Sequence, residues 1–83
     1  MKIFVEVNTP GNGKTYEFQL DSGMTVEQAK CVMIDEITEI ESGNITLKPE
    51  KVMLCNLSTQ TQLQDSDTLT AAGVRSGQSL LLL

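Results

Sequence analysis

Few side chains in this sequence have the chemistry of a catalytic or metal site. The chain has 83 residues and no histidine, so the commonest general base and the commonest metal ligand are both missing. Its two cysteines, Cys31 and Cys55, lie far apart without a CxxC motif, which favours reduced thiols over a zinc or thioredoxin-like site. We therefore expect no catalytic residue, no metal and no cofactor, and we do not expect an enzyme.

One short motif resembles part of a phosphate-binding loop. Gly13, Lys14 and Thr15 match its end, but Asn8 stands where the motif requires its first glycine. A strand pattern also follows, where the motif needs a helix. We interpret these residues as a hairpin turn.

Lys30 is the most informative charged residue. The helical periodicity around it places this lysine about 40° from the centre of an apolar stripe, so its ammonium must find a partner. A catalytic lysine with a perturbed pKa is the alternative to a structural ion pair. No second acid or cofactor motif accompanies Lys30, and we therefore favour the structural ion pair.

Charge and hydropathy restrict the partners. Six Lys and Arg against 11 Asp and Glu give a formal net charge of −5, and no segment is rich in basic residues. Nucleic acid and anionic membrane surfaces are therefore disfavoured, and a protein partner is expected. Because the sequence shows no apolar run of signal-peptide or membrane-spanning length, we expect a cytoplasmic protein without direct membrane insertion.

The first half of the chain predicts a hairpin followed by a helix. Apolar residues alternate over residues 2–7 and 15–20, with glycine-rich turn chemistry between them. The period then becomes helical, and we expect a helix over 26–41. Its apolar stripe begins at Val26 and ends at Ile40, and Thr25 and Gln28 are placed as a capping box before it. Gly43 and Asn44 are the expected end of this helix.

The second half predicts shorter elements. An unclassified connection over 45–50 leads to a strand over 52–55, and a polar stretch follows over 56–62. A one-turn helix over 69–72, stopped by Gly73, and a last strand over 79–83 complete the chain. This order predicts an α+β β-grasp fold in one domain, residues 1–83. The terminal strands are central in its mixed sheet, and the main helix packs across it.

The residues themselves resemble ubiquitin over nearly the whole length. The stretch from Met1 to Val5, the Gly13-Lys14-Thr15 turn, Thr25-Val26-Glu27 with Lys30, and Thr68-Leu69 carry this resemblance. It implies that Lys30 pairs with Asp65, because ubiquitin pairs a helix lysine with a loop aspartate at the matching positions. The chain ends at Leu83 without the Gly-Gly that a ubiquitin-type modifier requires, so no covalent conjugation is expected.

A more specific resemblance is to the YukD/EsaB family. It is carried by Val52-Met53-Leu54-Cys55, by Thr68-Leu69 with Ala72-Gly73-Val74, and by Ser76-Gly77 before a leucine-rich end. These are small bacterial ubiquitin-like proteins associated with type VII secretion. The resemblance implies an accessory or regulatory protein that binds the cytosolic part of the membrane secretion machinery. The alternative is a small ubiquitin-like subunit of a multicomponent oxygenase.

Strand parity predicts where a protein partner would bind. If Ile3, Val5, Leu80 and Leu82 face the helix, then the opposite face of the sheet exposes their neighbours. The resulting candidate protein-binding residues are Phe4, Met53, Leu81 and Leu83, which we expect to form one connected apolar patch. The recognition surface of ubiquitin lies on the corresponding face. A solvated face with scattered apolar residues, or a face covered by self-association or by the 45–50 connection, is the alternative.

Overall fold

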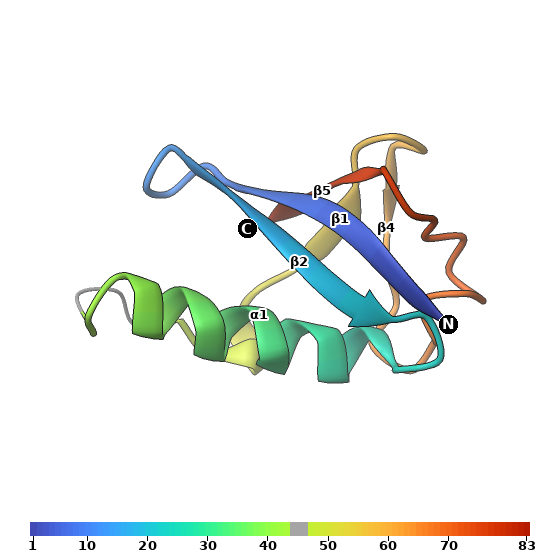
Figure 1. Ribbon diagram of the computed structural model, residues 1–83, viewed down its shortest axis with the longest axis horizontal. Helices are drawn as coiled ribbons and strands as arrows, with labels where there is room; N and C mark the ends of the chain where they lie inside the picture. The colour runs from blue at the N-terminus through green and yellow to red at the C-terminus, as the bar shows by residue number, and fades with distance from the viewer. Residues whose placement is uncertain (44–46) are drawn as a thin grey trace.

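A sheet with a helix across one face makes up the part of the chain that the computed structural model describes, residues 1–43 and 47–83. Within those residues the sheet has five strands in the order β2-β1-β5-β3-β4 (Figure 1). The last strand lies between the first and the third, as expected. The predicted α+β β-grasp arrangement is therefore confirmed.

The hairpin consists of β1, Lys2–Thr9, and β2, Lys14–Asp21, which pair antiparallel. Both strands are slightly longer than predicted. Side chains alternate between the two faces, so one face of the hairpin is apolar and buried, whereas most of the other is exposed. The buried apolar residues are Ile3, Val5, Val7, Tyr16, Phe18 and Leu20.

β5, Ser79–Leu82, joins the two halves of the sheet. It runs parallel to β1 and antiparallel to β3, Leu54–Asn56, while β4, Thr61–Gln62, pairs with the outer side of β3. The third strand thus begins and ends later than predicted. β3 ends at Asn56 because the buried Asn56 side chain accepts the Ser58 amide N–H at 2.9 Å and turns the chain.

The helix α1, Val26–Ile40, matches its predicted range except for the last residue. The capping box of Thr25 and Gln28 is present, and Gly43 has the left-handed backbone (φ 77°) expected after the helix. Ile40 was expected in the buried stripe, but it is 61% exposed, so burial along that stripe ends at Ile37. Asn44, together with the first two residues of the 45–50 connection, lies outside the described residues.

The prediction of a one-turn helix over 69–72 was wrong, because this segment forms turns. Its amides bond to a distant part of the chain: Leu69 N–H donates to the Met24 carbonyl and Thr70 N–H to the Ser22 carbonyl. Ala72 N–H donates to the Thr68 carbonyl in the helical pattern, but the next amide, Gly73 N–H, donates to the Thr70 carbonyl, so the segment closes as turns. A 3-10 turn, η1, Pro49–Lys51, precedes β3 and was not predicted.

A polar network joins the hairpin loop to the end of α1. Lys14 Nζ lies 2.6 Å from Glu41 Oε1, and the Tyr16 hydroxyl donates to Glu41 Oε2 at 3.0 Å. Asn12 Nδ2 donates to the same tyrosine hydroxyl at 3.1 Å. The Lys14 ammonium, followed by the Tyr16 hydroxyl, holds the pKa of Glu41 below its ordinary value, and Glu41 raises the pKa of Lys14. The network therefore fixes the loop relative to the helix.

This network predicts a specific dependence of stability on pH. Because the Glu41 pKa is lowered in the folded state, the stabilisation is present above its ordinary value of 4.5 and is lost as pH falls through the folded value. The free energy of unfolding should therefore fall more steeply below that pH in the wild type than in Glu41→Gln. Urea unfolding at several pH values measures this difference.

The matched control is Glu36→Gln, an exposed residue of the same helix. This variant should keep the steep acid dependence of the wild type. Equal acid dependence in Glu41→Gln and the wild type would contradict the role assigned to the network.

Candidate functional site

The outer face of the sheet, opposite α1, carries an exposed apolar group on β3 and β5. Met53 N–H donates to the Leu83 carbonyl at 3.0 Å, and Leu83 N–H donates to the Met53 carbonyl at 2.9 Å. The two residues are therefore directly opposite each other, just before β3 and just after β5. Met53 is 44% exposed and Leu83 is 54% exposed.

Leu81 extends this group toward the middle of the sheet. It is opposite Cys55 on β3 and opposite Asn8 on β1. Both Leu81 and Cys55 are half-buried, so they contribute to the surface less than Met53 and Leu83 do. We call Met53, Cys55, Leu81 and Leu83 the β3–β5 patch.

Phe4 is separate from the β3–β5 patch, although we expected one connected surface. Glu6 is opposite Ser79 and Asn8 is opposite Leu81, so Glu6 and Ser79 lie between Phe4 and Leu81 along the ladder. Two residues of strand span about 7 Å, which places Phe4 about 13 Å along β1 from the level of Leu81. Phe4 is 60% exposed. The expectation of a single connected patch was therefore wrong, because the register inserts a polar row.

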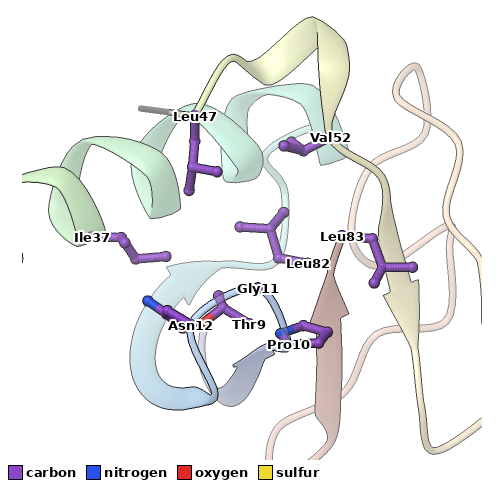
Figure 2. Close-up of a pocket in the computed structure, with 9 residues that line it drawn as sticks. All are labelled: Thr9, Pro10, Gly11, Asn12, Ile37, Leu47, Val52, Leu82 and Leu83. Atoms are coloured by element: carbon purple, nitrogen blue, oxygen red, sulfur yellow. Dashed lines mark hydrogen bonds between the residues drawn. The ribbon is translucent and has the colours of Figure 1, made fainter. Parts of the chain in front are cut away.

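A hollow of about 420 Å³ opens at the end of the sheet where the hairpin loop approaches α1 (Figure 2). Figure 2 shows the Leu82 side chain near the middle of the lining residues, with Ile37 to its left, Leu47 and Val52 above it, and Pro10 below it. The lining residues are Thr9, Pro10, Gly11, Asn12, Ile37, Leu47, Val52, Leu82 and Leu83. Since Leu83 belongs to both, the hollow adjoins the β3–β5 patch.

Lys30 and Asp65, the two residues expected to pair, are in contact. Lys30 Nζ lies 2.8 Å from Asp65 Oδ1 and donates to the Val52 carbonyl at 3.1 Å. The lysine side chain is 4% exposed, whereas that of Asp65 is 54% exposed. Lys30 thus connects α1 to the loop that contains Asp65 and to the segment that leads into β3. With two of its three N–H donors occupied in this way, the ammonium has a structural role.

The loop that contains Asp65 also satisfies the start of α1. Val26 N–H donates to the Asp67 carbonyl at 2.8 Å, and Glu27 N–H donates to the Asp65 carbonyl at 3.2 Å. These amides belong to the first helical turn, where no partner exists within the helix itself. Asp65 therefore positions the helix through its backbone as well as through its carboxylate.

Sequence reasoning did not identify two features of this surface. The hollow depends on residues from the hairpin loop, α1, the segment before β3 and β5, which only the folded chain brings together. The juxtaposition of Glu6 and Glu17 on the outer face depends on the hairpin register. The alternating pattern of the two strands and the length of the loop between them restrict the hairpin register. They do not determine it, because several loop geometries fit the same pattern.

Comparison with known proteins supports the fold. No family model and no curated protein matches the chain. Among solved structures, 391 chains match it, which is typical of a fold that serves many functions.

Two of these structures illustrate the similarity. The N-terminal ubiquitin-like domain in the 4931431F19Rik protein superposes with a TM-score of 0.73 at 23% identity, covering 99% of this chain and 73% of that chain. A protein designed de novo on the basis of ubiquitin superposes with a TM-score of 0.71 at 17% identity, covering 99% and 87%. This chain therefore has a ubiquitin-like fold. In the ranges 1–43 and 47–83, no helix is long and apolar enough to cross a membrane.

The unequal exposure of Lys30 and Asp65 predicts unequal effects of their removal. Asp65→Asn leaves the buried Lys30 ammonium without a counter-charge, because a neutral amide replaces the carboxylate, so it should destabilise the fold by about 1 to 2 kcal/mol. Lys30→Met removes the buried charge and keeps the volume, and the exposed Asp65 can be hydrated. It should cost less than about 1 kcal/mol.

Urea unfolding of both variants measures the two costs. A larger loss of stability in Lys30→Met than in Asp65→Asn would contradict this interpretation of the pair. The double variant Lys30→Met with Asp65→Asn should be no less stable than Asp65→Asn alone, because the unpaired charge is then absent.

Proposed function

We propose that this chain is a non-catalytic, ubiquitin-like protein-binding module that acts in the cytosol as an accessory or regulatory component of a type VII secretion system. The observation that carries the proposal is the β3–β5 patch. Met53 and Leu83 are large apolar side chains that are exposed side by side where β3 begins and β5 ends. Such contiguous exposure is typical of protein-interaction sites.

A non-catalytic role is supported by how the reactive side chains are used. In the described part of the chain, Lys30 is the one buried charged residue, and its ammonium is occupied by Asp65 and the Val52 carbonyl. The acid in the polar network, Glu41, is occupied by Lys14 and Tyr16. A catalytic site would require such groups to converge on an open cleft.

The secretion role rests on the resemblance to the YukD/EsaB family. Part of that resemblance falls on the β3–β5 patch itself, since Val52-Met53-Leu54-Cys55 supplies two of its four residues. The partner in this proposal is the cytosolic part of the membrane secretion machinery. The chain binds it through an apolar surface and does not insert into the bilayer.

A secretion assay tests the proposal. In the encoding organism, deletion of the gene should reduce export of small helical-hairpin substrates, and the wild-type gene should restore it. Met53→Asp should fail to restore export, because a carboxylate replaces an apolar side chain at the proposed contact. Export is measured by immunoblotting of the culture medium, and circular dichroism of the purified variant checks that it folds.

The matched control is Ile40→Asp, which also replaces an exposed apolar side chain with a carboxylate, but on α1 and away from the outer face of the sheet, and it should restore export fully. Normal export by the deletion strain would refute the secretion role. Normal export with folded Met53→Asp would refute the assignment of the patch. Flanking genes for a di-iron hydroxylase and a ferredoxin would instead favour an oxygenase subunit.

A further inference from the structure

Two carboxylates lie directly opposite each other on the outer face of the sheet. Glu6 on β1 and Glu17 on β2 are register partners, and both side chains are exposed. None of the ion pairs formed within residues 1–43 and 47–83 involves either of them. Like charges in directly opposed strand positions destabilise a sheet. The chain thus keeps a small electrostatic repulsion on the face that it exposes.

An exposed aromatic ring lies beside this acidic pair. Phe4 precedes Glu6 by two residues on the same face of β1, and its neighbour on the β5 side is Gly77, whose N–H donates to the Phe4 carbonyl at 2.7 Å. A glycine has no side chain to cover the ring. A shallow depression is lined by Phe4, Val5, Glu6, Glu17 and Gly77. A ring face and carboxylates together provide the chemistry that a guanidinium or ammonium group prefers.

The acidic pair borders the β3–β5 patch. Glu6 is opposite Ser79, and Leu81 is the next residue of β5 on the same face. The spacing of a sheet places Glu6 about 7 Å along the strand and about 5 Å across from Leu81. One short segment of a partner could therefore contact the patch and the acidic pair at the same time.

We infer that the partner segment bound by the β3–β5 patch is basic, with apolar side chains on Met53, Leu81 and Leu83 and an arginine or lysine over Glu6, Glu17 and the ring of Phe4. This inference rests on the proposed protein-binding function and specifies the chemistry of the partner. Charge complementarity carries it: within the described residues neither Glu6 nor Glu17 forms an ion pair, and the whole chain has a net charge of −5. The same net charge disfavours a second copy of this chain as the occupant.

Three synthetic peptides of about nine residues test the inference. All have leucine at two alternate positions, to match the spacing of residues on an extended strand. The next two alternate positions carry arginine, the neutral isostere citrulline, or glutamate. Each peptide is titrated into the isotopically labelled chain at low salt, and backbone amide chemical shifts are followed by NMR.

The arginine peptide should shift the amides of residues 4–6, 17, 53 and 81–83, and should bind about five-fold more tightly than the citrulline peptide. The glutamate peptide should bind most weakly. In the double variant Glu6→Gln with Glu17→Gln, the preference for the arginine peptide over the citrulline peptide should fall markedly, to the part that the ring of Phe4 supplies. The matched control, Glu36→Gln with Glu39→Gln, removes the same charge from α1 and should keep the preference.

Equal binding of the arginine and citrulline peptides to the wild type would overturn the inference. So would loss of the preference in the helix control, because the effect would then come from net charge alone. Absence of any shift with the arginine peptide, or self-association of the chain with shifts at the same residues, would also overturn it. The proposed function fails separately, through the export assay with Met53→Asp.

Discussion

The structure depends on one constraint: α1 covers a single face of the sheet. Residues of β1 and β5 that pack beneath the helix, such as Val7 and Leu80, are fully buried, and strand geometry sends their neighbours to the other face. Leu81 and Leu83 are therefore directed outward by the same alternation that builds the core. The apolar patch and the core are two consequences of one leucine-rich strand.

Lys30 shows how the helix is held in that position. Its ammonium contacts Asp65 and the Val52 carbonyl, so one side chain connects α1, the loop that contains Asp65 and the segment that leads into β3. At the other end of α1, Glu41 connects the helix to the hairpin loop through Lys14 and Tyr16. The two polar contacts fix both ends of the helix, while apolar packing supplies the core between them.

Much of the fold could be predicted from the sequence because its longer elements have strong periodicity. The hairpin alternates clearly from Ile3 to Leu20, and the Thr25 capping box marks the start of α1. β4 could not be predicted, since both of its residues are exposed and leave no apolar pattern. The prediction of a helix at Leu69 was wrong for a different reason. The Leu69 and Thr70 N–H groups donate to the Met24 and Ser22 carbonyls, and no local sequence pattern reveals such long-range bonds.

The sequence predicted which residues face outward on the candidate surface. It did not predict that the surface divides into two parts, because that depends on the pairing register of β1 and β5. Parity alone directs Phe4 and Leu81 to one face, but the pairing of Glu6 with Ser79 separates them.

The central claim is that the β3–β5 patch binds a protein partner. The most direct test of this claim is site-specific photo-crosslinking in cells, with a photoreactive residue at position 53 or, as a control, at position 36 on α1. We predict a discrete protein adduct from position 53 and none from position 36; an adduct from position 36 alone would contradict the account.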